Sequence, residues 1–199
     1  MTLAARLRSA LIDGYGRTLS LESDGRVAPG SLLSPAAVLV AVTDRAEPGL
    51  ILTMRASSLR KHAGQIAFPG GRVDPTDADE TAGALREAEE EIGLPPQQVE
   101  IVGTADRYHT FTGFDIIPVI GVVPPDLPLV PQESEVAAVF EMPLAFALDP
   151  ANQVRRSLMF DGVERHFYEI MWKDWRVWGI TAGILVNLSR RLGHAQAAA

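Results

Sequence analysis

One helix with well-marked ends, set among short apolar runs, restricts this chain to a mixed α/β fold. The helix is predicted from about residue 78 to residue 92, because Leu85, Ala88 and Ile92 recur at helical spacing and form one apolar face. Gly93, followed closely by two prolines, is a strong signal for the end of a helix.

The start and the interior of this helix carry two further signals. Asp77 and Glu80 stand three residues apart, and this spacing predicts a capping box at the N-terminus. Gly83 lies inside the helix, where glycine costs about 1 kcal/mol relative to alanine. We therefore expect contacts with the rest of the protein, rather than intrinsic propensity, to keep this segment helical.

Short apolar runs on both sides of the helix predict β-strands, because they contain β-branched residues and several are bounded by proline or turn residues. The predicted strands cover residues 36–42, 50–54, 99–102, 116–120 and 136–140, with a further candidate at 163–171. An amphipathic N-terminal helix and a C-terminal helix over about 177–192 complete the pattern. The expected class is α/β (α+β), with a sheet sandwiched between helices.

Charge and composition exclude several classes of protein. The 199 residues carry 18 Lys+Arg and 25 Asp+Glu, and the resulting net charge of −7 argues against general nucleic-acid binding. Without cysteine there is no disulfide, no thiolate zinc ligand and no thiol nucleophile. No apolar stretch approaches the roughly 18 residues of a membrane span, and the N-terminus lacks the apolar block of a signal peptide. We expect a cytoplasmic protein with a small-molecule substrate, and the sequence leaves a homodimer open.

The predicted helix also carries the strongest chemical signal. Glu87, Glu90 and Glu91 project from one face, since they are three and four residues apart. Like charges at this spacing destabilise a helix by about 0.2–0.5 kcal/mol per pair, and a bound cation would offset that repulsion. Oxygen ligands without His or Cys favour Mg²⁺ or Mn²⁺ over zinc. The alternative interpretation is a solvated acidic face.

Residues 70–94, GGRVDPTDADETAGALREAEEEIGL, resemble the Nudix box, the signature of Nudix hydrolases. The second half matches from Arg86 to Leu94, whereas the first half is one residue longer than the pattern and has Asp77 nearest to its early glutamate. The resemblance implies a single domain over residues 1–199, a Nudix-type α/β/α sandwich with a mixed sheet and with helical extensions at both ends. It also implies a metal site formed by Glu87, Glu90, Glu91 and Gly71.

A second motif precedes the box. Residues 51–71 resemble the coenzyme A signature of one Nudix subfamily, LLTxR-(S/A)-x3-R-x3-G-x3-FPGG, and only Ile51 departs from it. The longer box is also typical of this subfamily, and weaker matches continue at residues 111–114, 135–136 and 178–182. The chain is identified as a member of the coenzyme A pyrophosphatase group. This resemblance implies hydrolysis of coenzyme A or a derivative to 3′,5′-ADP and 4′-phosphopantetheine or its acyl form.

The two motifs also suggest which residues act on the substrate. The expected substrate-binding residues are Arg55, Arg60, Phe68 and Arg72, with Lys61 as a weaker candidate. The general base is expected to be Glu90 or Glu91 of the box, or the distal Glu135, with Glu133 and Glu141 as alternatives. His109 is expected to be structural, and Trp172, Trp175 and Trp178 are expected to belong to the core rather than to an adenine platform.

Three other functions remain open at this point. A Nudix hydrolase acting on ADP-ribose or on oxidised nucleoside triphosphates is the nearest, and the upstream motif weighs against it. A non-catalytic nucleotide sensor would be favoured by loss of a box glutamate, but all three are present. A metal-buffering acidic domain would not explain the FPGG sequence at residues 68–71 or Arg60.

Overall fold

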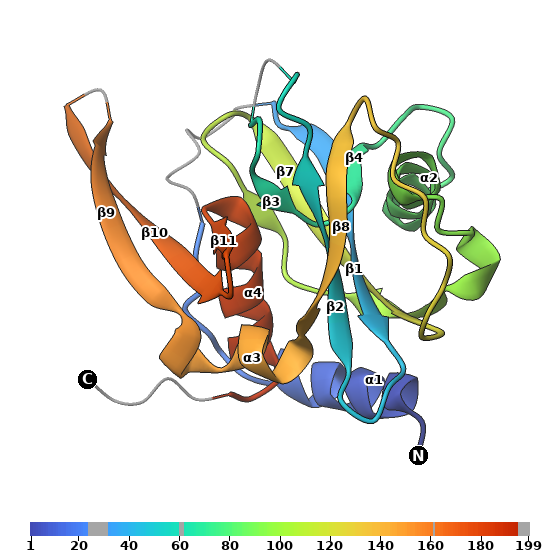
Figure 1. The fold of residues 1–199 in the computed structure, drawn as a ribbon. Coiled ribbons are helices and arrows are strands. Elements are labelled where there is room, and N and C mark those ends of the chain that lie inside the picture. The colour runs from blue at the N-terminus through green and yellow to red at the C-terminus, as the bar shows by residue number, and fades with distance from the viewer. Residues whose placement is uncertain (24–31, 60–61, 161, 195–199) are drawn as a thin grey trace.

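The computed structural model describes residues 1–23, 32–59, 62–160 and 162–194. A mixed eight-stranded sheet forms its centre, and a three-stranded antiparallel sheet stands beside it. In Figure 1, helix α2 covers one side of the large sheet, and helix α4 lies on the other side, between the two sheets. The predicted mixed α/β class with a mixed sheet is confirmed.

The bounds of the elements are as follows. The large sheet contains β1 (Ser34–Thr43), β2 (Gly49–Arg55), β3 (Ile66–Ala67), β4 (Gly70–Arg72), β5 (Glu100–Thr104), β6 (Tyr108–His109), β7 (Phe114–Val123) and β8 (Val136–Pro143). The small sheet contains β9 (Val154–Phe160), β10 (Val163–Trp172) and β11 (Trp175–Trp178). The helices are α1 (Leu3–Tyr15), α2 (Glu80–Ile92), α3 (Leu144–Leu148) and α4 (Ile180–Arg191), with short 3₁₀ turns at Pro96–Gln98 and Pro150–Asn152.

A parallel pair at the centre makes the large sheet mixed. Strands β1 and β7 pair in parallel from Ser34 opposite Phe114 to Thr43 opposite Val123, whereas the other pairs in this sheet are antiparallel. The path through the sheet is β3-β2-β1-β7-β5, with β8 on β2, β4 on β1 and β6 on β7. Parallel central strands are usually buried on both faces and therefore read as continuous apolar runs.

Alternate residues of β1 enter two separate hydrophobic cores. Leu39 and Ala41 pack with Ala88 and Ile92 of α2, in the core on one side of the sheet. Val40, between them in sequence, enters the core on the other side, which α1, α4 and the small sheet cover. The two-residue period of a strand produces this division. The apolar face predicted for the central helix is therefore the face that fixes α2 to the sheet.

The N-terminus of α2 differs from the predicted capping box. Asp79, not Asp77, is the N-cap, and its carboxylate accepts the N–H of Ala82 at 2.8 Å. Asp77 instead folds over the helix, because a Cβ on Gly83 would lie only 3.0 Å from its Oδ2. Gly83 therefore permits a close approach of the preceding loop. The predicted end of the helix is confirmed, with Gly93 in the left-handed conformation at φ 65°.

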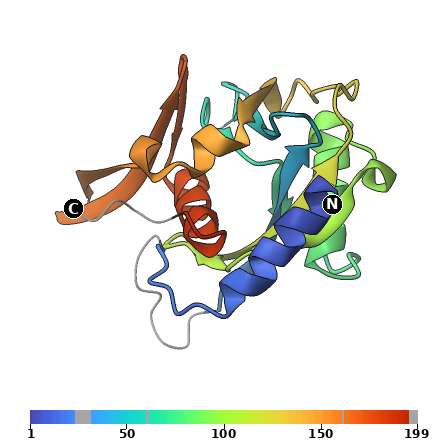
Figure 2. The same cartoon turned by 90° about the horizontal axis from the view of Figure 1, so that it is seen from below.

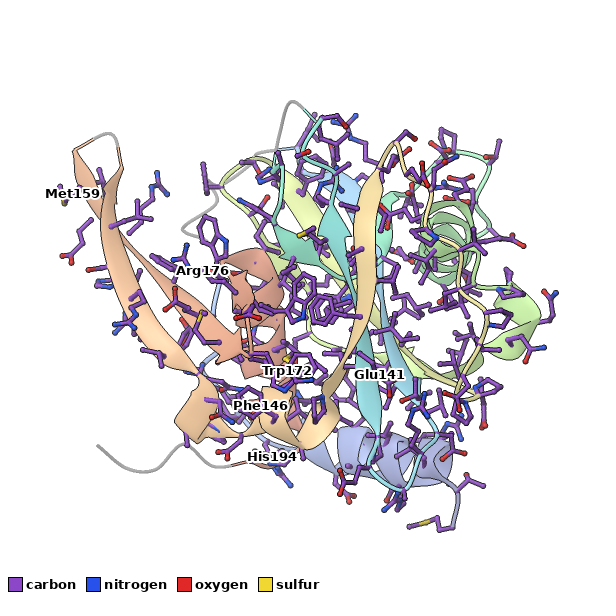
Figure 3. The ribbon with its side chains drawn as sticks, in the orientation of Figure 1. Glu141, Phe146, Met159, Trp172, Arg176 and His194 are labelled. Carbon is purple, nitrogen blue, oxygen red and sulfur yellow. The ribbon has the colours of Figure 1, made fainter. Side chains whose placement is uncertain are left out.

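The C-terminal part of the chain shows the largest difference from the predicted elements. The expected helix over 177–192 begins only at Ile180, because residues 175–178 form β11. Gly179, at φ 63°, separates the strand from the helix. The expected strand at 163–171 is present as β10, but its partner β9 was not predicted. Figure 3 shows Met159 near the tip of the resulting β9–β10 hairpin, away from the central sheet.

Arg191 near the end of α4 forms a buried ion pair with Asp106, in the segment after β5, and also hydrogen-bonds to the end of α1. Arg191 of α4 donates to both carboxylate oxygens of Asp106, at 2.8 and 2.6 Å, and to the carbonyl oxygens of Gly14 and Arg17 at 2.6 and 3.2 Å. Helix α1 packs against both α4 and β5. Figure 2, seen from below, shows α1 in blue across the lower side of the molecule, with α4 in red nearby. No helix in the described part of the chain combines the length and hydropathy needed to cross a lipid bilayer.

Candidate active site

A cavity of about 500 Å³ opens between the large sheet and the C-terminal elements. Its walls are mostly apolar and come from β1, β3, β4 and β7 on one side and from β9, β10, β11 and α4 on the other. Three of the residues expected to contact substrate, Arg55, Phe68 and Arg72, line this cavity together with Gly71. Arg60 and Lys61 lie outside the described residues.

Two consecutive glycines bring strand β4 into contact with the carboxylates of α2. The N–H of Gly70 donates to Glu91 Oε2 at 3.1 Å. A Cβ on Gly71 would lie 2.7 Å from Glu87 Oε1, closer than side chains tolerate. Gly70 also has φ 150° and no room for a side chain, because a Cβ there would meet the carbonyl oxygen of Ala37 at 2.4 Å. This part of the strand therefore requires glycine for both conformation and space.

Burial and negative neighbours govern the charge of two box glutamates. The pKa of Glu91 is raised to about 7, mainly by burial and also by the charges of Glu87 and Glu135, and the Gly70 N–H and Arg55 oppose this rise. Burial also raises the pKa of Glu87, with Glu90 and Glu135 contributing in the same direction. A cation bound next to these two carboxylates would therefore stabilise their charged forms.

The distal Glu135 lies close enough to the box to influence it, because its charge acts on both Glu87 and Glu91. A backbone hydrogen bond from the Ala56 N–H to the Glu135 carbonyl, 2.8 Å long, fixes this residue beside the end of β2. Its side chain is exposed. Geometry thus keeps Glu135 among the candidates for the general base.

Glu141, one of the alternative candidates for the general base, is hydrogen-bonded in another part of the molecule. It accepts hydrogen bonds from Thr43 and, at 2.9 Å, from Arg45, and so stabilises the β1–β2 turn. Figure 3 shows Glu141 on the lower half of β8, away from α2. We therefore exclude it as the base. Glu133 is exposed, on the loop that leads into β8.

Arg86 is the residue whose role sequence reasoning missed. Its Nη1 donates to Glu87 Oε1 and to Glu90 Oε2, both at 3.0 Å, while its Nε and Nη2 donate to Asp77 at 3.0 and 3.1 Å. The guanidinium therefore offsets part of the repulsion for which the sequence suggested a metal ion alone. The signal was available in the sequence, since Arg86 precedes Glu90 by one helical turn.

The oxygen atoms around the box glutamates suit a divalent cation once one side chain rotates. Within the described ranges, no three His, Asp or Glu side chains already converge on one point. The available donors are nevertheless all hard oxygens, the carboxylates of Glu87, Glu90 and Glu91 and the carbonyl of Gly71, which suits Mg²⁺ or Mn²⁺. Glu90 is exposed and bound to Arg86, so it would have to rotate away from the guanidinium to join the others. With that rotation, the residues fit the ion.

Replacement of Gly71 by alanine tests the close approach of β4 to α2. The new Cβ would displace the carboxylate of Glu87, which is the end of a flexible side chain and can move. We expect at least a tenfold loss of kcat/KM with a small change in the free energy of unfolding. Steady-state kinetics and urea denaturation would measure the two quantities. Gly16→Ala is the control, since a Cβ there meets nothing nearer than 3.5 Å; full activity in Gly71→Ala would contradict the role of this contact.

His109 and the three tryptophans near the C-terminus occupy different surroundings in the structure. His109 Nε2 lies 3.2 Å from Asp115 Oδ1 and does not line the cavity, as expected of a structural residue. Trp172 and Trp175 stack on Phe140, with ring centroids 6.0 and 4.2 Å away, and join the two sheets. Trp178 differs from the expectation for a core residue, because it lines the cavity.

Comparison with known proteins identifies the relatives of this chain. Residues 33–161 match the family model described as the NUDIX domain. The chain is similar to a protein of Cronobacter sakazakii named uncharacterized Nudix hydrolase NudL, with 51% identity over 163 residues, 80% of this chain and 83% of the relative. The protein of the same name from Escherichia coli is 48% identical over 158 residues, 79% of this chain and 82% of the relative.

The solved structures that resemble this chain have lower sequence identities than these relatives. An Ap4A hydrolase of C. elegans in a binary complex has a TM-score of 0.48 and 21% identity, covering 55% of this chain and 80% of that one. The NUDIX domain of Shewanella oneidensis NrtR, complexed with ADP ribose, has a TM-score of 0.43 and 22% identity, covering 74% and 87%. Scores below 0.5 support no statement about substrate.

Proposed function

Because this chain belongs to the Nudix hydrolase family, a family of hydrolases that cleave diphosphate bonds in small molecules with the help of divalent metal ions, we propose that its substrate is coenzyme A or a derivative of it. The products would be 3′,5′-ADP and 4′-phosphopantetheine, or the acylated form of the latter.

One observation carries this choice: residues of both motifs line one cavity. Arg55 and Phe68 come from the upstream motif, and Gly70, Gly71 and Arg72 join that motif to the box. Arg55 Nε is buried and makes no hydrogen bond to the described residues, while its Nη1 is 3.9 Å from Glu91 Oε1. A guanidinium in this position suits a phosphate oxygen next to the box.

Glu87, Glu90, Glu91 and the Gly71 carbonyl would hold Mg²⁺ or Mn²⁺, which supplies charge neutralisation on the diphosphate and acidifies a bound water. Arg55 and Arg72 would bind the phosphate oxygens and orient the diphosphate against this face of α2. Glu135, exposed beside the box, would accept the proton of the attacking water. Arg60 belongs to the same motif and is proposed as a further phosphate contact on the sequence alone.

The role of Glu135 can be tested by replacement with glutamine. We expect kcat to fall by about 100-fold or more, as is usual when general-base catalysis is lost, while metal affinity changes little. The pH dependence of the rate and a metal titration would measure both. Glu47→Gln, the same change at an exposed glutamate between β1 and β2, serves as the control. An unchanged rate and pH profile in Glu135→Gln would return the role of base to Glu90 or Glu91.

The proposed substrate can be tested directly with a panel of diphosphates analysed by mass spectrometry in ¹⁸O water. Coenzyme A should give label in one of the two phosphate products and should be the preferred substrate over ADP-ribose and oxidised nucleoside triphosphates. If either of the latter is hydrolysed far faster than any form of coenzyme A, the subfamily assignment is wrong and the Nudix assignment stands.

A further inference from the structure

We propose that Arg165, held over the ring of Phe111, binds a second phosphate of the substrate, one carried by the ribose and separate from the diphosphate. This inference rests on the proposed function and extends it. The substrate class would be a nucleoside diphosphate ester with an additional monophosphate on the sugar. Coenzyme A has such a 3′-phosphate, whereas dephospho-coenzyme A and ADP-ribose do not.

A single turn carries two arginine–phenylalanine pairs at the cavity. The guanidinium carbon of Arg72, which follows the two glycines of β4, lies 5.3 Å from the ring centroid of Phe114. That of Arg165, on strand β10, lies 4.6 Å from the ring centroid of Phe111. All four residues line the cavity. Residues 111–114 thus contact one arginine from β4, the strand that adjoins α2, and another from β10 on the C-terminal wall.

The backbone of this turn is held by hydrogen bonds, which set the positions from which the Phe111 and Phe114 side chains start. Thr110 is 1% exposed, and its hydroxyl accepts the N–H of Phe114 at 3.0 Å. The Thr110 N–H in turn donates to the Phe114 carbonyl at 2.9 Å. Gly113 adopts φ 90°, and its carbonyl accepts the N–H of Ser34 at 2.8 Å.

The chemistry of both arginine sites suits phosphate. A guanidinium stacked on a ring is fixed in its plane and keeps the N–H groups along its edge for a bidentate contact with an oxyanion. Arg72 and Arg55 stand beside the box, where the diphosphate would bind. Arg165 comes from the opposite wall of the cavity. The anion that suits its guanidinium is therefore a second phosphate on the same substrate molecule.

The cavity wall near Arg165 is suited to the nucleoside that would connect the two phosphate sites. Phe167 and Trp178 form an edge-to-face pair with ring centroids 5.6 Å apart, and both line the cavity. Aromatic faces of this kind accept a base or the apolar side of a sugar. Arg165, Phe167 and Trp178 also lie beyond residue 161, where the match to the family model ends. We therefore assign substrate selection to the C-terminal wall and bond cleavage to the box.

Kinetics with coenzyme A and dephospho-coenzyme A provide the test, because the two differ only in the 3′-phosphate. The wild-type protein should prefer coenzyme A by about 10- to 100-fold in kcat/KM, the value of one charge-assisted contact. Arg165→Gln should lower kcat/KM for coenzyme A by the same factor, mainly through KM, and leave dephospho-coenzyme A within about twofold. Arg165→Lys should recover part of the preference.

Equal efficiency of the wild type on the two substrates would overturn the inference while leaving the proposed function intact. So would an equal loss on both substrates in Arg165→Gln. Arg155→Ala is the matched control, since Arg155 is an exposed arginine of the same hairpin and does not line the cavity. It should leave both substrates unchanged, and circular dichroism would verify that each variant is folded.

Binding of products without metal separates this inference from the proposed function. By calorimetry, 3′,5′-ADP should bind the wild type about 10-fold or more tightly than 5′-AMP, and Arg165→Gln should abolish that difference. A preference for 3′,5′-ADP in a protein that does not cleave coenzyme A would support the phosphate site and refute the proposed substrate. Equal binding of the two nucleotides by the wild type would refute the phosphate site.

Discussion

Replacement of Glu87, Glu90 or Glu91 by glutamine is expected to lower kcat by at least about 100-fold in the presence of Mg²⁺ or Mn²⁺. Loss even of a residue that only supports a metal ligand commonly costs 10- to 100-fold, so the loss of a ligand itself should cost more. The variants should remain folded, because each removes one negative charge from a mutually repelling group. Single-turnover kinetics and urea denaturation would measure the two effects.

Glu89→Gln is the matched control for these three variants. Glu89 lies on the same helix and is exposed, but is not part of the face shared by the other three. It should retain full activity. Near-normal turnover in all three box variants would mean that these carboxylates stabilise the contact with β4 but do not bind a metal ion that catalysis needs.

Replacement of Arg191 by methionine is expected to lower the free energy of unfolding by about 3–5 kcal/mol, the usual cost of removing one partner of a buried ion pair. The side chains of Arg191 and Asp106 are only 7% and 12% exposed, so Asp106 would be left with an uncompensated charge. The carbonyls of Gly14 and Arg17 would lose their donor as well. Urea denaturation at several pH values would give the change.

Two comparisons make this prediction specific. Glu100→Gln removes a largely exposed pair with Arg8, whose hydrogen bond to the Ile101 carbonyl remains, and should cost no more than about 1 kcal/mol. Joint replacement of Arg191 and Asp106 by apolar residues should cost less than the sum of the single changes, since no charge is then left unpaired. A loss below about 1 kcal/mol in Arg191→Met would show that water reaches this pair.

Local signals account for the parts of the fold that were predicted correctly. Helix α2 ends at a glycine in the left-handed conformation, and β1 and β7 are continuous apolar runs, so neighbouring residues suffice to recognise them. Strands β3 and β4 have only two and three residues and exist because β2 and β1 offer them hydrogen-bonding partners. A local sequence pattern does not indicate that a partner strand is available. Strands β9 and β11 of the small sheet were missed for the same reason.

The candidate site also has parts that local sequence reveals and parts that it does not. Its carboxylate helix and the glycines of β4 stand in continuous motifs, and the sequence pointed to them directly. Phe111, Arg165 and Trp178 come from three separate segments and meet only where the C-terminal elements cover the large sheet. Their cooperation depends on tertiary structure alone, which is why the sequence suggested Trp178 for the core and assigned nothing to Arg165.

The parallel pairing of β1 with β7 has a consequence for how the protein acquires its site. Residues 44–113, which include the box helix and β4, all lie within the loop that this pairing closes. Closing so long a loop is costly in chain entropy and is slow compared with local helix or hairpin formation. The contact between β4 and α2 spans only about 20 residues and does not require this loop to be closed. The cavity wall formed by Phe114 and Ile116 of β7 does require it, because the pairing is what places β7 beside β1. Completion of the cavity, unlike formation of the carboxylate helix, therefore depends on the pairing at the centre of the sheet.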